Sequence, residues 1–331
     1  MSTRKIELSV GATKIANKYE ILTEEEIDNI DKIPELEERV DIVEDELEES
    51  LKFEVVGEGS AVPDISGVYD DTEIRGMIDT VKNKYLTGAT MISHRGAWKF
   101  APQNSRKAFE IAYSQGFKVI ETDIVKTKDD NFIMFHDGVV NNILNGSGNV
   151  SELNLSAIKS MSFNSKEPNT DLFPNERVLD FAEFLTLVKG MNLNVVLEFK
   201  YYPSIDDLNV IKDMINLYDL INSFSFSAFN LDILKAVRIV FPHNLLINSI
   251  NGDITEDSIT DDMKKLKPFA LCPYFKSLTN TGVKIANKNN IFVIPYDVNS
   301  YTEYINAITW GCVSTINDCI GGYNINGSYI L

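Results

Sequence analysis

The residues of this chain best suited to chemistry are concentrated between positions 90 and 137. Two of the three histidines, His94 and His136, lie in this stretch. Two carboxylates, Glu121 and Asp123, occupy alternate residues within it. Alternate residues of a strand point to the same face, and carboxylate oxygens on one face suit a hard divalent cation such as Ca²⁺ or Mg²⁺. The stretch therefore predicts an acidic metal site with histidines nearby.

A second segment adds charge of both signs to this group. The apolar residues 195–197 are followed by Glu198 and Lys200, which are two residues apart and so share a face of the predicted strand. Glu198 could complete a three-carboxylate cation site, and Lys200 could bind a phosphate. The predicted cofactor is thus one divalent cation, either Ca²⁺ or Mg²⁺.

The histidines suggest the reaction. His94, with Arg95 beside it, ends the first predicted strand of the main domain. Two histidines facing one cation suit acid–base catalysis on a phosphodiester, one accepting a proton and the other protonating the leaving oxygen. The third histidine, His243, follows a predicted helix in Phe-Pro-His-Asn and is expected in a surface loop.

Strand-like and helix-like segments alternate from residue 88 onward, and this alternation predicts an α/β protein, a (β/α)8 TIM barrel. Most strand segments are short and apolar without alternation, as in strands buried on both faces. The predicted strands are 90–93, 118–124, 131–136, 194–199, 223–227, 244–249, 268–272, 291–296 and 312–316. The predicted helices include 105–115, 180–189, 205–219, 230–240, 256–265, 279–289 and 300–309. Asp180 and Glu183 form a candidate capping box for the second of these helices.

Nine strands are one more than the barrel needs. Segments 118–124 and 131–136 are joined by too few residues for a parallel crossover, so they are predicted to form an antiparallel hairpin. With Asp129 and Asp130 as a two-residue loop, Asp123 lies opposite His136. The hairpin would then present its two carboxylates and a histidine on one side.

The first fifty residues differ from the rest, with sixteen acidic and six basic side chains that carry −10 of the formal net charge of −18. Apolar residues recur there at spacings of three and four, as in a coiled-coil seam: Ile33, Leu36, Val40, Val43 and Leu47. This spacing fits a short coiled coil that joins copies of the chain, for example into a homotrimer. It equally fits an amphipathic helix that lies on the main domain. The predicted domains are an attachment or oligomerisation segment at 1–56, a linker and helix at 57–86, and the barrel at 87–331.

Composition excludes several classes of partner. The acidic net charge would repel nucleic-acid phosphates. No apolar run is long enough to span a membrane, and the N-terminus lacks the apolar core of a signal peptide. Three irregularly spaced cysteines suit neither a disulfide framework nor a zinc site.

Taken together, these motifs resemble the glycerophosphodiester phosphodiesterase family. That family's pattern is His-Arg-Gly, Pro-Glu-Asn-Thr, Glu-x-Asp, Thr-Lys-Asp-Gly, His-Asp and Glu-x-Lys. This chain has, in the same order, His94-Arg95-Gly96, Pro102-Gln103-Asn104-Ser105, Glu121-Thr122-Asp123, Thr127-Lys128-Asp129, His136-Asp137 and Glu198-Phe199-Lys200. The resemblance covers roughly residues 88–320 and implies a barrel with an insertion after His-Asp, here about 138–177.

The resemblance also implies roles for individual residues. His94 and His136 would be the acid–base pair, Glu121, Asp123 and Glu198 would hold the metal, and Arg95 and Lys200 would bind the phosphate. The glycerol 2-hydroxyl would attack phosphorus, and water would open the resulting cyclic phosphate. In place of the family's usual residues stand Gln103 for Glu, Asp130 for Gly and Tyr296-Asp297 for Trp-Thr. Tyr296 could still offer an aromatic wall to a glycerol moiety, whereas Asp297 is unexpected beside an anionic substrate.

The activity predicted is therefore metal-dependent hydrolysis of glycerophosphodiesters. The acidic segment and linker before the barrel suggest a virion component, a phage tail protein that contacts other tail proteins and cleaves glycerol-phosphate teichoic acid at the host cell surface. Two alternatives are a cytoplasmic enzyme that acts on phospholipid head-group diesters and a catalytically silent barrel that only binds wall polymer.

Overall fold

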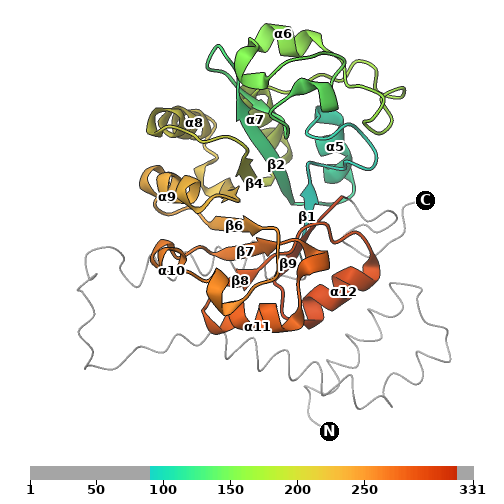
Figure 1. Cartoon of the computed structure of the whole chain (residues 1–331). Helices are drawn as coiled ribbons and strands as arrows, with labels where there is room; N and C mark the ends of the chain where they lie inside the picture. Colours follow the sequence, from blue (N-terminus) through green and yellow to red (C-terminus); the bar gives the residue numbers. More distant parts are fainter. Residues whose placement is uncertain (1–89, 319–331) are drawn as a thin grey trace, which may run out of the picture. The chain divides into compact units, whose positions relative to one another are not determined.

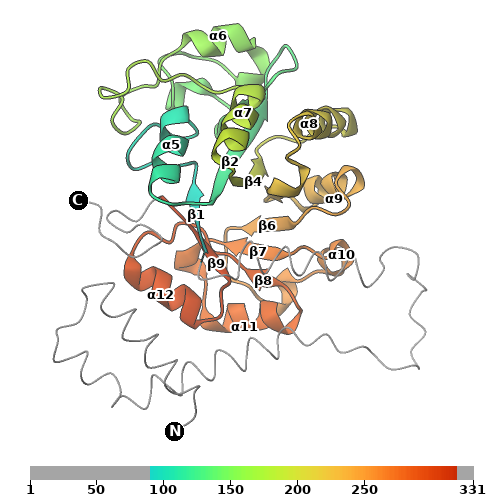
Figure 2. The same cartoon turned by 180° about the vertical axis from the view of Figure 1, so that it is seen from behind.

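The computed structural model describes residues 90–318, and the strands in this range form a nearly closed barrel (Figures 1 and 2). Eight strands are parallel, in the order β8-β7-β6-β5-β4-β2-β1-β9. The ends of this path meet through the backbone: the N–H of Val313 donates to the Val293 carbonyl at 3.1 Å, and that of Ile316 to the Pro295 carbonyl at 2.8 Å. The strands are β1 (Thr90–His94), β2 (Val119–Lys126), β4 (Asn194–Phe199), β5 (Phe224–Ala228), β6 (Leu246–Ile250), β7 (Ala270–Pro273), β8 (Phe292–Val293) and β9 (Ser314–Asn317). The predicted (β/α)8 fold is confirmed.

Helices lie outside the strands and connect them (Figure 1). Their apolar faces are buried, as Ala108, Phe109 and Ala112 are in α5. The helix predicted at 256–265 is shorter than expected, because a separate 3-10 turn, Glu256–Ser258, precedes α10, which Thr260 caps. The helices are α5 (Arg106–Ser114), α6 (Leu155–Ser160), α7 (Phe181–Met191), α8 (Ile205–Leu217), α9 (Leu231–Val240), α10 (Asp261–Leu266), α11 (Asn280–Lys288) and α12 (Tyr301–Thr309).

The interior of the barrel is layered, and this layering positions the site. One buried cluster joins apolar side chains from seven of the parallel strands and the ends that extend them, including Ile92, Val119, Val196, Ile247, Ala270, Ile294 and Ile316. Because a strand has a period of two, the next inward-facing residues toward the C-terminal ends are polar at most of these positions. His94, Glu121, Glu198, Ser249 and Asp318 are among them. An apolar layer thus forms the floor beneath a polar one.

The β2–β3 hairpin forms, but its predicted register is wrong by one residue. β3 (Phe132–Met134) pairs antiparallel with β2, with Ile124 opposite Met134, so Asp123 faces Phe135 rather than His136. The loop has three residues, 128–130, because the Thr127 N–H donates to the Asn131 carbonyl at 2.8 Å. Asp130 ends the loop in the left-handed region at φ 58°. A three-residue loop that ends in this conformation is a standard hairpin connection and shifts the pairing by one. β3 stops before His136, which therefore is not held in the ladder.

Residues 138–177 form a separate layer against this hairpin. They contain α6 and two 3-10 turns, Val140–Asn142 and Val150–Glu152. Their apolar side chains pack with Val125, Ile133 and Phe135 of the hairpin in one buried cluster. The segment is therefore anchored by its own core beside the C-terminal end of β2.

The segments predicted at 1–56 and 57–86 lie outside the described residues, as do the first and last residues of the predicted barrel domain, 87–331. Within residues 90–318, no helix combines the length and the apolar character needed to cross a membrane.

The N-terminus of α7 offers a test of local stability. Asp180 accepts a hydrogen bond from the Glu183 N–H, Glu183 accepts one from the Asp180 N–H, and Lys159 pairs with Asp180 at 2.8 Å, so the predicted capping box is confirmed. Burial raises the pKa of Asp180, but Lys159 and the Glu183 N–H outweigh it and lower that pKa below 3.8.

We expect Asp180→Ala to reduce the free energy of unfolding by about 1 kcal/mol, the usual value of an N-cap. Since the folded pKa is depressed, this stabilisation is complete above pH 3.8 and is lost as pH falls through the folded value. Urea unfolding at pH 7 and below pH 3 measures both effects. Asp171→Ala, at an exposed residue, is the control, and an equal loss in the two variants would contradict the assignment.

Candidate active site

Three carboxylates meet at the C-terminal ends of β2 and β4. Glu121 and Asp123 lie two residues apart on β2, and the register of the parallel pair places Glu198 of β4 opposite Asp123. Oxygen atoms of all three lie within 4.8 Å of one another. The residues are only 3%, 1% and 8% exposed, respectively. Charges of one sign are thus held together away from water.

This acidic cluster is electrostatically unsatisfied. Among the described residues, Glu121 Oε1 and Asp123 Oδ1 accept no hydrogen bond, and the cationic group paired with Asp123 Oδ1 is Lys200 Nζ at 3.3 Å. Burial, together with repulsion by the other two carboxylates, raises the pKa of Glu121 well above its ordinary value, and burial likewise raises the pKa of Glu198. Buried, mutually repelling carboxylate oxygens that accept no hydrogen bond are suitable ligands for a hard divalent cation. The cluster therefore fits a metal ion, and its chemistry suits Ca²⁺ and Mg²⁺ alike.

Two cationic side chains compensate part of the negative charge. Arg95 Nε lies 3.3 Å from Asp123 Oδ2, and Lys200 Nζ lies 3.3 Å from Asp123 Oδ1 and also hydrogen bonds Glu198. Burial would raise the pKa of Asp123, but Arg95 and Lys200 outweigh it and lower that pKa. Burial lowers the pKa of Lys200, but the attraction of Asp123 and Glu198 outweighs it and raises that pKa to about 12. Both cations are therefore charged and directed at the cluster.

The backbone after β1 brings Arg95 to this position. Arg95 is left-handed at φ 52°, and its N–H donates to the Glu121 carbonyl at 3.0 Å. Gly96 follows at φ 75°, where an added Cβ would lie 2.7 Å from the backbone of Ala108 in α5. Only glycine allows this close approach. Asn104 then donates from Nδ2 to Asp123 Oδ2 at 2.9 Å, so the loop is fastened to the cluster at both ends.

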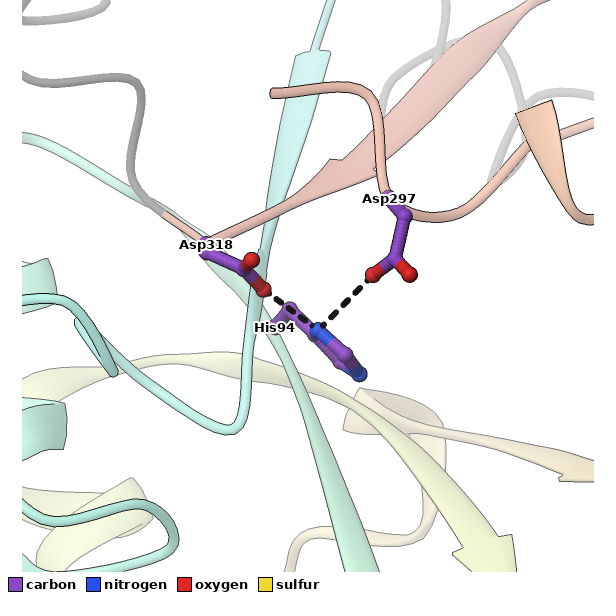
Figure 3. Close-up of side chains that lie close together, drawn as sticks. All are labelled: His94, Asp297 and Asp318. Carbon is purple, nitrogen blue, oxygen red and sulfur yellow. Dashed lines mark hydrogen bonds and ion pairs between the residues drawn. The ribbon is translucent and has the colours of Figure 1, made fainter. Parts of the chain in front are cut away.

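Each of the two histidines is oriented by a carboxylate. His94 Nδ1 lies 2.6 Å from Asp318 Oδ1 and 3.6 Å from Asp297 Oδ1 (Figure 3). His136 Nδ1 lies 2.5 Å from Asp137 Oδ1. A carboxylate that accepts the Nδ1–H leaves Nε2 as the basic nitrogen of the neutral ring.

The Nε2 atom of His94 lies 3.9 Å from Glu121 Oε2, so this nitrogen faces the acidic cluster. Burial lowers the pKa of His136, Asp123 opposes this, and Arg95 and Lys200 contribute to the lowering. A lowered pKa favours the neutral ring near pH 7, the form that accepts a proton.

The predicted site residues lie together. One pocket is lined by His94, Arg95, Glu121, His136, Glu198, Lys200 and Tyr296, and Asp123 contacts Arg95 and Lys200 in it. Tyr296 stands at the rim, where its ring lies 5.5 Å from Tyr274 and 6.2 Å from Phe229 and its hydroxyl donates to Asn251 at 3.1 Å. His243 is exposed, as expected of a loop residue.

The two carboxylates that hold the histidines, Asp318 and Asp137, have no role predicted from the sequence. Asp137 directly follows His136, which was a usable signal. Asp318 follows β9, and barrel closure places β9 beside β1, so an acid after the last strand was the signal for a partner of His94. Asp297, unexpected near an anionic substrate, points at the same ring nitrogen from the other side (Figure 3).

Three buried carboxylates with two histidines beside them at the C-terminal ends of the strands lie where the active sites of (β/α)8 barrel enzymes are found. The glycerophosphoryl diester phosphodiesterase family matches residues 94–321, more than two thirds of the chain. The chain belongs to this family. It is an enzyme, a glycerophosphodiester phosphodiesterase, as the motifs predicted.

Individual relatives agree. The glycerophosphodiester phosphodiesterase of Caldanaerobacter subterraneus is 26% identical over 237 residues, which are 69% of this chain and 93% of that protein. The Oleispira antarctica phosphodiesterase, solved in complex with its product sn-glycerol-3-phosphate, has a TM-score of 0.63 at 18% identity and covers 73% of this chain and 96% of its own. The glycerophosphodiester phosphodiesterase of Thermotoga maritima has a TM-score of 0.54 at 16% identity, covering 70% and 95%. The two structural likenesses concern the fold.

Metal binding by the acidic cluster can be tested by stability alone. We expect Ca²⁺ or Mg²⁺ at a hundred times its Kd to stabilise the wild-type protein by about 2.7 kcal/mol. Glu121→Gln removes one ligand charge and much of the repulsion, so without cation its melting temperature should equal or exceed that of the wild type. With cation, its melting temperature should rise little.

Calorimetric melting with and without the cation measures these shifts. Glu176→Gln, which changes a carboxylate outside the cluster, should retain the full response to cation. A cation-dependent shift of the same size in Glu121→Gln would show that the cation binds elsewhere.

Proposed function

We propose that this enzyme cleaves glycerophosphodiesters by attack of the substrate's own glycerol 2-hydroxyl on phosphorus, with His94 and His136 as the acid–base pair. The observation that carries the proposal is the arrangement of two histidines, each with Nδ1 against a carboxylate, in one pocket with a three-carboxylate cluster and two cationic side chains. Glu121, Asp123 and Glu198 would hold the divalent cation, which supplies Lewis-acid activation of the hydroxyl and charge neutralisation when bound.

The proton transfers balance between the two rings. One histidine accepts, at Nε2, the proton of the glycerol 2-hydroxyl. At the same time the oxygen of that hydroxyl forms a bond to phosphorus. The other protonates the oxygen of the leaving alcohol as the phosphorus–oxygen bond breaks. The product is a cyclic phosphate, which water opens with the proton-transfer roles reversed.

Arg95 and Lys200 are proposed to bind the phosphate. Both line the pocket and are half-buried, and both lie 3.3 Å from Asp123. Cationic groups that are already in place stabilise the charge that develops on the phosphoryl oxygens without reorganising at the moment of reaction. Tyr296, beside Phe229 at the rim, would provide the wall against which the glycerol moiety lies.

The mechanism predicts a graded loss of activity. His94→Ala and His136→Ala should each lower kcat by roughly 10²- to 10⁴-fold, because each removes one proton transfer. Asp318→Asn should lower it by about 10- to 100-fold, because the ring of His94 loses its orienting carboxylate. Chelation of divalent cations should abolish turnover in all variants.

Release of alcohol from glycerophosphocholine measures these losses. Asp171→Asn, at an exposed residue, is the control and should keep wild-type activity. A barrel that only binds polymer would release nothing in any variant, and His94→Ala would leave its polymer affinity unchanged.

For the natural substrate we propose glycerol-phosphate teichoic acid, with the enzyme acting at the host cell surface as a tail component of a phage virion. Two features support this: each phosphodiester of poly(glycerol phosphate) has a neighbouring hydroxyl, and an acidic segment with a coiled-coil pattern precedes the barrel. The rival is a cytoplasmic enzyme for phospholipid head-group diesters, whose linkage has the same neighbouring hydroxyl.

Side-by-side assays on purified poly(glycerol phosphate) and glycerophosphocholine separate these substrates. We expect at least a tenfold larger kcat/KM per linkage for the polymer, a difference of about 1.4 kcal/mol in transition-state binding. Native mass spectrometry complements the assay. We expect the intact protein to be a trimer and a variant lacking residues 1–56 to be a monomer. A preference for the small diester together with a monomeric intact protein would favour the cytoplasmic enzyme.

A further inference from the structure

A buried carboxylate of the 138–177 segment contacts the site but has no part in the chemistry proposed above. Glu167 is only 6% exposed. Its Oε2 accepts the backbone N–H of Gln103 at 3.0 Å, and its Oε1 accepts Gln103 Nε2–H at 2.8 Å. Gln103 Oε1 in turn accepts from Arg95 Nη1 at 2.7 Å. A continuous chain of hydrogen bonds therefore runs from Glu167 to the proposed phosphate-binding guanidinium.

The donor and acceptor types in this chain specify one arrangement. Both oxygens of Glu167 accept, so the Gln103 amide must turn its NH₂ toward Glu167 and its carbonyl toward Arg95. Arg95 can only donate, which requires the same orientation from the other side. The reversed amide would leave buried donors facing one another, at the cost of unsatisfied polar groups.

The charges are also matched. Position 103 carries a neutral amide beside the charged Glu167, and the ion pair of Arg95 is with Asp123 at 3.3 Å. A carboxylate at position 103 would lie in hydrogen-bond distance of Glu167, two buried charges of one sign in contact. The glutamine at position 103 and the glutamate at position 167 are therefore complementary.

Two other hydrogen bonds join residues 138–177 to the chain that follows β1, but they do not lead to Arg95. Asn169 Nδ2 donates to the Phe100 carbonyl at 3.0 Å, and Glu176 Oε2 accepts the Lys107 N–H at 3.2 Å. The first fastens the β1–α5 loop and the second the first turn of α5, but among the described residues these two contacts do not extend to a side chain of the pocket. Glu176 is thus a matched control for Glu167: it is the same residue type and accepts a backbone N–H four residues further along the chain, in the first turn of α5.

We propose that Glu167 is a positioning residue, which acts through Gln103 to aim the guanidinium of Arg95 at the substrate phosphate. This inference rests on the proposed phosphate-binding role of Arg95. It gives the segment after His-Asp a part in catalysis, since the alignment of Arg95 depends on a side chain from that segment.

A charge-exchange cycle tests the proposal. Glu167→Gln should lower kcat/KM for glycerophosphocholine by roughly 10- to 100-fold, the usual effect of a lost hydrogen bond to a charged group. Gln103→Glu should cause a comparable loss through repulsion.

The double variant with both substitutions restores every donor–acceptor match, since the amide at 167 can donate to the carboxylate at 103, which still accepts from Arg95. It should recover to within roughly threefold of the wild type, as coupled residues do. Glu176→Gln should stay at the wild-type level.

The affinity for inorganic phosphate, measured by calorimetry on the same proteins, reports the position of Arg95 without turnover. It should fall in both single variants and recover in the double variant, in the same order as kcat/KM. Equal effects of Glu167→Gln and Glu176→Gln, or a double variant no better than the poorer single variant, would overturn the proposal. If a single variant fails to fold, wild-type phosphate affinity in the double variant supports it and a tenfold loss overturns it. A wild-type protein that hydrolyses no diester would instead contradict the proposed function, and the phosphate affinities would still decide the role of Glu167.

Discussion

Three buried carboxylates, with oxygens within 4.8 Å of one another, are the constraint on which the rest of this structure depends. Glu121, Asp123 and Glu198 repel one another in a poorly solvated layer, and burial raises the pKa of two of them. Such a group persists only where the surrounding fold compensates it, because unpaired buried charge is costly. Arg95 and Lys200 supply part of the compensation, and a divalent cation fits the oxygens that accept no hydrogen bond within the described residues.

The barrel supplies this compensation through geometry. Parallel strands end at one rim, so residues far apart in the chain converge there, two positions beyond the apolar interior layer. Closure is equally important, because it makes β9 the neighbour of β1 and brings Asp318 within 2.6 Å of the ring of His94. The proposed base or acid is thus oriented by the last strand of the described fold.

The segments outside the barrel complete the site. The β1–α5 loop begins and ends in left-handed residues, Arg95 and Asn104, whose backbone cost is offset by bonds to Glu121 and Asp123. The 138–177 segment supports both halves of the pocket: Asn142 donates to Asp137 at 2.7 Å behind His136, and Glu167 holds Gln103 behind Arg95. Its apolar side chains pack with the hairpin in one buried cluster, which fastens the segment beside the pocket.

Much of this was determined by the sequence alone, because it depends on local periodicity. The period of two put Glu121 with Asp123 and Glu198 with Lys200 on shared faces, the alternation of strands and helices specified the barrel, and Asp180 marked a helix start. The hairpin register was missed, because two- and three-residue loops have similar sequences and the choice depends on the left-handed turn at Asp130. The partnerships of His94 with Asp318 and of Gln103 with Glu167 were decided only by the tertiary structure. They join residues separated by 224 and 64 positions, and no local pattern records which distant side chains barrel closure and the packing of an inserted segment bring into contact.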